Sequence, residues 1–156
     1  MFIAGAKTYV NILFVIAAAT AFARAMTLLR YPQTISKAVL AVTNSKILIL
    51  LLMNVIMLVC GMILDNIPNI MILTPIFLPI LKAVGINPVH FGIVMTANLA
   101  IGMVTPPMGI NLFVASGMTK VPMLKLAKAC TPFLIAFILC LLLITFIEPL
   151  SLFLPA

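Results

Sequence analysis

Two short polar interruptions of an otherwise apolar chain hold the residues that could do chemistry. They are residues 65–68, DNIP, and residues 105–109, TPPMG, each flanked by apolar runs of membrane character. Helix-breaking backbone at membrane depth is tolerated only where it is buried in protein or lines a water-filled cavity. Because one short chain has two such breaks, the sequence predicts a transport site rather than a surface that faces lipid.

The second break predicts a cluster of oxygen ligands. Pro106 and Pro107 have no backbone N–H, so the carbonyls of Gly102 and Met103 lose their helical hydrogen-bond donors. Thr105 precedes a proline and is pushed out of helical dihedral angles. Freed carbonyls and a hydroxyl are hard ligands of the kind that coordinate Na⁺ at unwound helices of transporters. The alternative for this loop is a proline hinge that binds no ion.

Beyond this break, a second half-helix presents its N-terminus to the same place. Gly109 allows a positive φ if the turn requires one. The unpaired N–H groups and the positive end of the helix dipole that follow it suit a carboxylate. Nearby amide side chains can donate further hydrogen bonds. The substrate-binding candidates are Asn66, Asn98, Pro106, Pro107 and Asn111.

The first break contains similar groups. Pro68 frees the carbonyl of Leu64, and Asp65 and Asn66 add side-chain oxygens. An acidic residue inside the membrane is a functional-site candidate by default, although Asp65 has the equal alternative of capping the helix that follows. With the second break included, the candidate Na⁺ ligands are Gly61, Leu64, Asp65, Gly102, Met103, Thr105 and Gly109.

The composition indicates the fold class. Of the 156 residues, 65% are hydrophobic and 7% are charged, and the mean hydropathy is +1.39. A soluble domain has about 25% charged residues, and the alternating pattern of a membrane β-barrel is absent. The chain is therefore expected to be an all-α polytopic membrane protein in a lipid bilayer. Its net charge of +7 comes from bases scattered at segment ends, which favours headgroup anchoring over nucleic-acid binding.

Catalytic machinery is not expected. The sequence contains no Ser/His/acid set, no Gly-rich phosphate loop and no cluster of metal ligands, so we predict neither an enzyme nor a cofactor, only Na⁺ as coupling ion. The two acids, Asp65 and Glu148, are far apart in the sequence. The single histidine, His90, lies in the first turn after a proline, where a structural or capping role is favoured.

Five segments of a single domain, residues 1–156, position the two breaks. The first is a scaffold helix that meets the requirement of about 20 residues for a bilayer span, and the second has the mixed polarity of an interfacial arm helix. The third has two arms of about 16–18 residues, so a re-entrant helical hairpin is preferred over two thin crossings. The fourth is a discontinuous transmembrane helix that starts at Asn87-Pro88, and the fifth is a C-terminal transmembrane helix after a turn that holds Lys125 and Lys128. Pro32 is expected to break the chain before the second segment, and Gly85 to close the third. In order, the segments are 6–29, 33–43, 47–84, 88–118 and 131–150.

At these residues the chain resembles the large membrane subunit of the tripartite ATP-independent periplasmic (TRAP) transporters, of the DctM type. The resemblance runs over the whole chain and is strongest in NPVHFGIVMTANLAIGMVTPPMGINLFVASG. It continues in GMILDNIPNIMILTPIFLPI and in the closing EPLSLFLP. The first stretch is specific because it joins HFG and an internal NL to TPPMG, whereas TPP-G alone would be weak.

The resemblance implies an elevator-type secondary transporter that is driven by Na⁺. Its substrates would be C4-dicarboxylates or other organic acids such as sialic acid, delivered by a periplasmic substrate-binding protein. A small membrane subunit of the DctQ type would be its partner in the bacterial inner (cytoplasmic) membrane. Such large subunits contain two inverted repeats, each with a re-entrant hairpin and a broken helix. This chain resembles the second, C-terminal repeat and begins inside a scaffold helix.

One departure from the family lies at the hairpin tip, where Asn66 and Ile67 stand in place of frequent hydroxyl residues, so ion ligation there is expected from the backbone. Membrane orientation is the second difficulty. The positive-inside rule barely favours a cytoplasmic hairpin foot, whereas the resemblance places that foot at the periplasm, and we follow the resemblance. The bases on one side are Arg24, Arg30, Lys37, Lys46 and Lys82, and those on the other are Lys7, Lys120, Lys125 and Lys128.

Two other functions are compatible with the sequence. An unwound helix can also line the pore of a channel. A fragment that lacks its partner repeat would be a membrane remnant that transports nothing.

Overall fold

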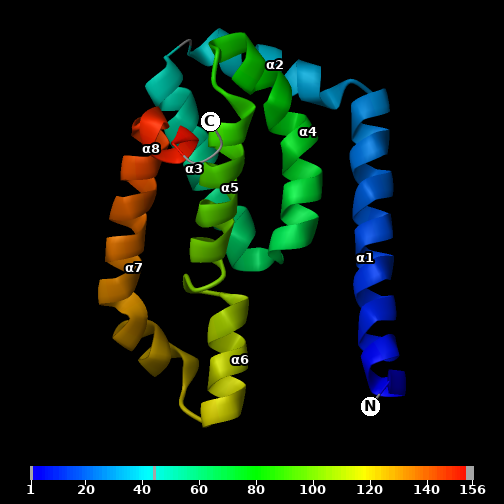
Figure 1. Ribbon diagram of the computed structural model, residues 1–156, viewed down its shortest axis with the longest axis vertical. Coiled ribbons are helices and arrows are strands. Elements are labelled where there is room, and N and C mark those ends of the chain that lie inside the picture. Colours follow the sequence, from blue (N-terminus) through cyan, green and yellow to red (C-terminus); the bar gives the residue numbers. More distant parts are fainter. Residues whose placement is uncertain (1, 44, 154–156) are drawn as a thin grey trace.

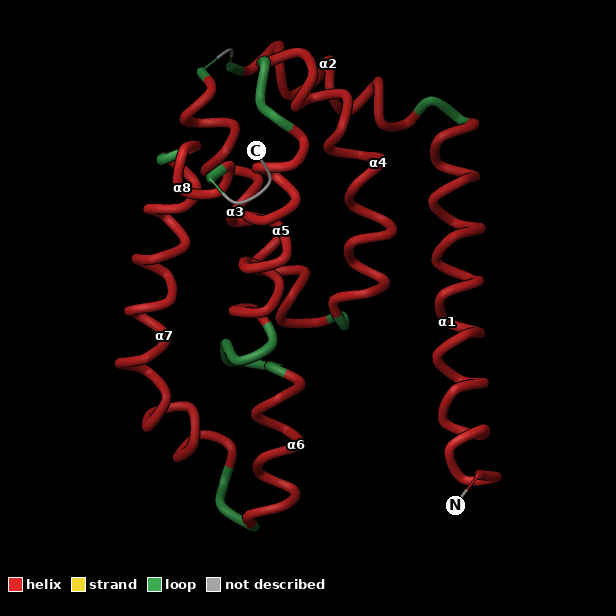
Figure 2. The backbone as a smooth tube through the Cα atoms, viewed as in Figure 1, coloured by secondary structure: helices red, strands yellow, loops and turns green. Residues whose placement is uncertain are grey.

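The computed structural model describes residues 2–43 and 45–153, so residue 44 and both extremities of the predicted domain lie outside the described part. The described residues form helices and no strands, which confirms the all-α class. Figures 1 and 2 show α1, α4, α5 followed by α6, and α7 side by side, with α2 across one end. The helices are α1 (Phe2–Leu28), α2 (Tyr31–Val42), α3 (Lys46–Ile63), α4 (Asn66–Val84), α5 (Pro88–Gly102), α6 (Ile110–Thr119), α7 (Met123–Phe146) and α8 (Glu148–Leu152).

Several helices are built to cross a membrane. α3, α4 and α7 are long and apolar enough to do so. A fourth span is counted if the bent pair Leu13–Leu28 and Tyr31–Ala41, which meet at 65°, is taken as one. The chain is therefore an all-α polytopic membrane protein.

The turn between α1 and α2 lies earlier than predicted. Arg30 is the N-cap of α2 with a left-handed φ of 56°, and Pro32 lies in the first turn of that helix. Proline is accepted there because the N–H that it lacks would have no helical partner in any case. The predicted arm helix, 33–43, therefore begins at Tyr31 and includes Pro32 rather than following it.

The two predicted hairpin arms are α3 and α4, but the break between them is shorter than expected. Only Leu64 and Asp65 lie outside the helices, and Pro68 belongs to the first turn of α4. The arms have different neighbours, because α3 packs mainly on α5 whereas α4 packs mainly on α1 and α2. Figure 1 shows the α3–α4 turn level with the α5–α6 break, and α1, α6 and α7 extend beyond it. A hairpin that turns back within the membrane would have this arrangement.

The predicted discontinuous helix, 88–118, is observed as α5 and α6, separated by residues 103–109. Asn87 caps α5 as the Asn-Pro start predicts, and its side chain accepts a hydrogen bond from the N–H of Val89 at 2.9 Å. The break and the resumption of the helix thus agree with the sequence pattern.

The last helix differs from the predicted span at both ends. The prediction placed it at 131–150, with Lys125 and Lys128 in a preceding turn, but both lysines lie within α7. At the other end α7 stops at Phe146, and Pro149 lies in the first turn of the separate helix α8. Pro149 has no N–H to bond the carbonyl of Thr145 and its ring crowds that carbonyl, which favours a break, although Pro132 is accommodated inside α7.

The core lies where α3, α4 and α5 meet. Between helices in lipid the gain comes from close packing rather than from removal of apolar surface from water. The rings of Phe77 and Phe91 meet edge to face with centroids 5.8 Å apart, a favourable aromatic geometry. The cluster is Ile49, Leu50, Met53, Met57, Leu73, Phe77, Ile80, Leu81, Ile86, Phe91, Val94, Met95, Leu99 and Leu141.

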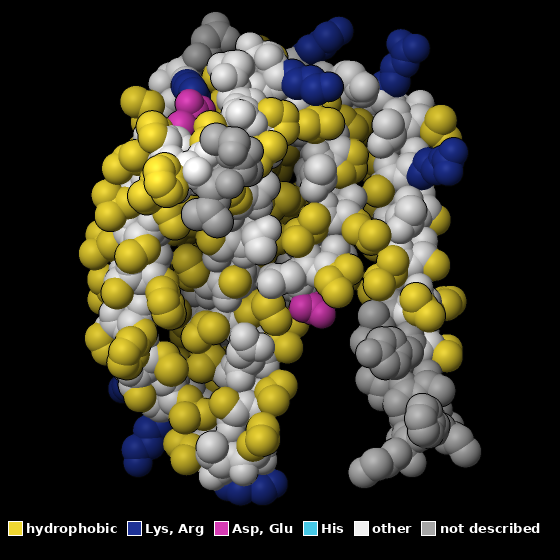
Figure 3. Space-filling model, viewed as in Figure 1, with side chains coloured by type: hydrophobic (Ala, Val, Ile, Leu, Met, Phe, Trp, Pro, Cys, Tyr) yellow, Lys and Arg dark blue, Asp and Glu magenta, His cyan; other side chains and the backbone are white. Residues whose placement is uncertain are grey.

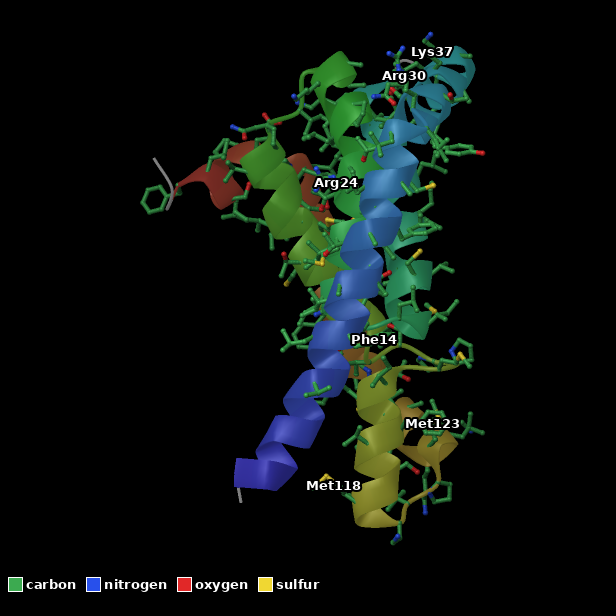
Figure 4. All side chains as sticks on the ribbon, turned by 90° about the vertical axis from the view of Figure 1, so that its right-hand side faces the viewer. Phe14, Arg24, Arg30, Lys37, Met118 and Met123 are labelled. Atoms are coloured by element: carbon green, nitrogen blue, oxygen red, sulfur yellow. The ribbon has the colours of Figure 1, made fainter. Side chains whose placement is uncertain are left out.

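Basic side chains lie toward the two ends of the molecule, and the surface between them is mainly hydrophobic apart from one acidic side chain near the middle (Figure 3). Figure 4 shows Arg24, Arg30 and Lys37 toward one end, and Met118 and Met123 toward the other. The side chain of Lys7 lies outside the described part. This distribution matches the expected anchoring of basic residues at the two interfaces of a bilayer.

Candidate functional site

Asp65 caps α4 at the turn of the hairpin. Its Oδ1 accepts a hydrogen bond from the N–H of Asn66 at 2.8 Å, and its carbonyl accepts from the N–H of Asn69 at 3.3 Å. One of the two roles predicted for this residue is thus observed. The Asp65 side chain is exposed, and a carboxylate with one hydrogen bond has lone pairs left for a cation.

Asn69 holds the turn together, a role that the sequence analysis missed. Its side chain is 1% exposed, and its Nδ2 donates to the carbonyls of Cys60 and Leu64, both at 3.1 Å. The prediction that Pro68 leaves the Leu64 carbonyl open is therefore wrong, because a side-chain donor replaces the missing N–H. An amide in an apolar helix must find hydrogen bonds, and this requirement was the available signal.

Asn66 leaves a polar atom unsatisfied at the same turn. Its Oδ1 is buried and has no hydrogen-bond partner among the described residues. A buried acceptor without a donor costs about 1–3 kcal/mol, so this oxygen favours a cation or a donor from a ligand. Because this position departs from the family pattern, we expected ion ligands only from the backbone here. The structure adds the unpartnered Oδ1 of Asn66 as a candidate side-chain ligand.

The carbonyls that the tandem prolines deprive of donors find other donors in the second break. The Thr105 N–H donates to the carbonyl of Gly102 at 2.9 Å, and the Asn111 N–H donates to the carbonyl of Met103 at 3.1 Å. The two carbonyls thus lose their helical donors as predicted, but N–H groups of the loop and of α6 take the place of the lost ones. Each carbonyl oxygen keeps a second lone pair.

The N-terminus of α6 is closed in the same way. The N–H of Gly109 donates to the carbonyl of Thr105 at 3.2 Å, that of Asn111 to the carbonyl of Met103 at 3.1 Å, and that of Leu112 to the carbonyl of Gly109 at 2.8 Å. Most of the N–H groups predicted to be free for a carboxylate are thus engaged. What remains for an anion is the helix dipole and the exposed side chain of Asn111.

Gly109 is needed for close approach rather than for a positive φ. Its φ is 6°, outside the left-handed region that the sequence analysis allowed for. A Cβ on Gly109 would lie 2.9 Å from the carbonyl oxygen of Met103 and 3.0 Å from that of Thr105. The Thr105 hydroxyl, 8% exposed, donates to the carbonyl of Ile101 at 2.7 Å. The α5–α6 loop is thus packed closely against the carbonyl oxygens of Met103 and Thr105.

Two glycines bring the breaks together. Gly61, near the end of α3, and Gly102, at the end of α5, lie against each other with no side chain between the helices. A Cβ on Gly102 would lie 2.8 Å from both the Cα and the carbonyl carbon of Gly61, and 3.0 Å from the carbonyl oxygen of Leu58. Both glycines were predicted as ion ligands. Their observed contact is a helix crossing of the kind that small residues permit in membranes.

A small apolar cleft lies beside this crossing. It has a volume of ≈ 290 Å³ and lies between the end of α3 and the start of α6. Pro106 and Pro107 are exposed in the adjoining loop. The cleft is lined by Met62, Ile63, Met108, Ile110, Phe113 and Val114.

Asn98 was predicted to bind substrate, but the structure places it inside the helix packing. It is fully buried, and its Nδ2 donates to the carbonyl of Asn54 at 3.0 Å and to Oδ1 of Asn54 at 2.6 Å. The Nδ2 of Asn54 in turn donates to the carbonyl of Leu50 at 3.0 Å and to Oγ1 of Thr145 at 3.3 Å. These side chains link α3, α5 and α7, which favours a packing role for Asn98 over substrate binding.

His90 has the structural role that the sequence favoured, although it does not act as a helix cap. It is fully buried, its Nδ1 is hydrogen-bonded to Oγ of Ser151, and its Nε2 lies 3.2 Å from the carbonyl of Thr145. It therefore ties the first turn of α5 to α7 and α8.

The ligands gathered at the breaks are oxygens of carbonyl, hydroxyl, amide and carboxylate groups. Within the described ranges, no group of three or more His, Cys, Asp or Glu residues could hold a metal ion. Oxygen sets of this kind suit hard cations rather than transition metals. Fold and site together define a polytopic helical membrane protein in which two interrupted helices meet.

Comparison with known proteins identifies the family. The family model described as "Tripartite ATP-independent periplasmic transporter, DctM component" matches residues 1–150, so the chain belongs to the DctM family of TRAP transporters. It is 48% identical over 144 residues to the isethionate TRAP transporter permease protein DctMQ of Oleidesulfovibrio alaskensis. This alignment covers 92% of this chain and 22% of that protein. It is 38% identical over 149 residues to the C4-dicarboxylate TRAP transporter large permease protein DctM of Pseudomonas aeruginosa. This alignment covers 96% of this chain and 35% of that protein.

A third relative has the same coverage pattern. The chain is 37% identical over 149 residues to the C4-dicarboxylate TRAP transporter large permease protein DctM of Vibrio cholerae, which covers 96% of this chain and 33% of that protein. The chain thus spans from 22% to 35% of the length of these three relatives. The family resemblance seen in the sequence is confirmed, and these relatives are named as transporter permeases.

Proposed function

We propose that this chain supplies half of the transport site of a Na⁺-coupled secondary transporter that imports small organic anions. The observation that carries the proposal is the Gly61–Gly102 contact, which joins the ends of α3 and α5 next to both breaks. Coupling of an ion to a solute requires both to bind near one element that can change its arrangement. Two interrupted helices that touch at their broken ends meet that requirement.

The Na⁺ ligands that we propose are oxygens at the two breaks. From the hairpin they are the carboxylate of Asp65 and the unpartnered Oδ1 of Asn66. From the α5–α6 loop they are the hydroxyl oxygen of Thr105 and the second lone pairs of the carbonyls of Gly102 and Met103. The close backbone contacts of Gly61 and Gly109, and the hydrogen bond that the Leu64 carbonyl accepts from Asn69, make these three residues supports of the site rather than its main ligands.

The substrates that we propose are small organic acids. The relatives named above are permeases for C4-dicarboxylate and for isethionate, a sulfonate, and each of these compounds is an anion. The sequence has no Lys or Arg at either break. A helix terminus contributes only about 0.3–2 kcal/mol to anion binding, so substrate affinity here should be weak and should depend on bound Na⁺. C4-dicarboxylates are our first candidates, and sialic acid is another.

The remaining parts of the proposal follow from the family. The first repeat, a small membrane subunit of the DctQ type and a periplasmic substrate-binding protein would complete the transporter in the bacterial inner membrane. An elevator-type movement would carry the site across the bilayer, and the hairpin foot would face the periplasm.

The test is uptake of labelled C4-dicarboxylate by proteoliposomes that contain this chain assembled with a first repeat, a small subunit and a binding protein. Uptake is expected only with an inward Na⁺ gradient, and K⁺ should not replace Na⁺. Thr105→Val removes the hydroxyl but keeps the side-chain shape, so it should raise the Na⁺ concentration needed for half-maximal uptake. Thr96→Val is the matched control, because its hydroxyl also donates to a carbonyl four residues back, that of Gly92, at 2.9 Å.

Different failures of this test point to different conclusions. Ion current that flows without a gradient of substrate would indicate a channel. Uptake that continues in K⁺ would reject Na⁺ coupling while leaving transport intact. An equal Na⁺ requirement in the Thr105→Val and Thr96→Val proteins would remove Thr105 from the ligand set.

A further inference from the structure

A pocket of mixed charge lies at the end of the molecule where α3 begins and α7 ends, away from the two breaks. Lys46 is the first residue of α3 and Glu148 the first of α8, and Nζ of Lys46 lies 2.9 Å from Oε1 of Glu148. The side chains are 42% and 36% exposed, so both charges remain accessible. The pocket has a volume of ≈ 290 Å³, and its apolar walls include Ile47, Leu50, Phe146 and Pro149.

An apolar groove continues from this pocket along α7. It has a volume of ≈ 540 Å³, and Phe146 lines both the pocket and the groove. Its residues on α7 are spaced three and four apart, so they share one face of the helix over about 10 Å. Figure 3 shows the hydrophobic surface that runs down this side of the molecule below adjoining acidic and basic side chains. The groove is lined by Leu139, Leu142, Leu143, Phe146 and Ile147.

The position of the pocket relative to the spans suggests what it meets. α3 and α7 are both long and apolar enough to cross the membrane, and each has one end at this pocket. The ends of spanning helices lie among lipid headgroups, and the middle of a span lies among acyl chains. The charged pocket therefore lies at headgroup depth, and the groove leads from it toward the bilayer centre.

We propose that the pocket and groove bind one phospholipid whose headgroup carries a phosphate and a primary ammonium, as in phosphatidylethanolamine. The phosphate would accept hydrogen bonds from Lys46, the ammonium would donate to Glu148, and one acyl chain would lie along the groove. The ion pair uses one of the three N–H groups of Lys46 and one oxygen of Glu148, which leaves donors and an acceptor for the lipid. Charge-assisted hydrogen bonds of this kind are the strong ones.

The charges select among headgroups. The hydrogen bond from Lys46 lowers the pKa of Glu148, so the carboxylate is ionised at neutral pH. A phosphatidylglycerol headgroup has no cation, and Glu148 would repel it. A phosphatidylcholine headgroup has a cation but no N–H to donate. The occupant is therefore a lipid rather than another protein segment, because the pocket offers paired opposite charges that a zwitterionic headgroup complements.

The experiment is native mass spectrometry of the chain released from detergent micelles in the presence of equal amounts of the three phospholipids with identical acyl chains. We expect phosphatidylethanolamine to be retained about tenfold over phosphatidylglycerol, from one or two charge-assisted bonds. Glu148→Gln should reverse this order, because the remaining Lys46 charge then favours the anionic lipid. Lys46→Met should lower the retention of both.

The controls separate the pocket from general surface charge and from folding. Lys120→Met removes a base that caps α6, far from this pocket, and should keep the wild-type preference. Phe146→Ala leaves both charges in place and should lower the retention of all three lipids by a similar factor. Equal retention of the three lipids by the wild type, an unchanged order in Glu148→Gln, or loss of the order in Lys120→Met would each overturn the proposal. So would loss of the preference in the assembled transporter, where another segment would then occupy the pocket.

Discussion

The crossing of α3 and α5 at Gly61 and Gly102 should be the position in this chain least tolerant of a single added methyl group. Gly102→Ala places a Cβ 2.8 Å from the Cα and the carbonyl carbon of Gly61. Carbon atoms in good contact are about 3.5–4.0 Å apart, so α3 must move away by roughly 0.7 Å or more. The atoms in the way are backbone, so no side chain can rotate to make room.

The cost can be bounded from general values. Overpacking costs about 1–3 kcal/mol when side chains must shift, and a backbone obstacle places this variant in the upper part of that range or above it. Alanine is a better helix former than glycine by about 0.5–1 kcal/mol, which offsets part of the loss. The expected net loss of stability is therefore about 1–2 kcal/mol, and the two breaks move apart.

The assay compares unfolding in mixed micelles for two variants of the same helix. Gly92→Ala is the matched control, because a Cβ there meets nothing within 4 Å, and it should leave stability unchanged or raise it. Gly102→Ala should unfold at a lower fraction of denaturing detergent and, in the complete transporter, should lose Na⁺-dependent uptake. If the two variants prove equally stable, the crossing is not as tight as the argument requires.

Three further predictions concern polar groups in the packing. Asn69→Leu removes both donors to the hairpin turn, so it should cost about 1–3 kcal/mol and raise hydrogen exchange at the α3–α4 turn, whereas the exposed Asn111→Leu should do neither. Asn98→Leu should be destabilising by a similar amount because Asn54 loses its donor, and the double variant with Asn54→Leu should recover part of the loss in the same unfolding assay. The Lys46–Glu148 ion pair lowers the folded-state pKa of Glu148 below 4.5, so its contribution, about 0.2–1 kcal/mol for an exposed pair, should be complete above that pH. This stabilising contribution should disappear as the pH falls through the lowered pKa. The measurement is the difference in unfolding free energy between wild type and Glu148→Gln as a function of pH.

Helix positions could be predicted because they depend on local chemistry. Asn87-Pro88 starts α5, the tandem prolines end it, and Gly85 closes α4 with a left-handed φ of 71°. These signals act within a few residues of each other, so they survive without knowledge of the tertiary structure. Two separate errors were made at the last helix. At its start the lysines were taken as a turn signal although they lie within α7, and at its end the restriction at Pro149 was given too little weight.

Hydrogen-bond partners at the breaks could not be predicted in the same way. The sequence shows correctly that prolines remove donors, but the replacement donors depend on how the chain folds back. The Met103 carbonyl is satisfied by a residue eight positions later, and the Asn54–Asn98 bond joins residues 44 positions apart. Counting lost N–H groups along the sequence therefore overestimates the number of open oxygens, because buried carbonyls in a folded protein are nearly all paired.

The hairpin turn depends on a side chain because its two arms have different neighbours. α3 is fixed to α5 at the glycine crossing and to α5 and α7 by the Asn54 hydrogen bonds, whereas α4 packs on α1 and α2. Little packing between the arms themselves opposes their separation. The bonds from Asn69 to Cys60 and Leu64 cross from one arm to the other at the turn. A movement of α4 with α1 and α2 relative to α3 would therefore act first on these bonds, and through them on Asp65 and Asn66.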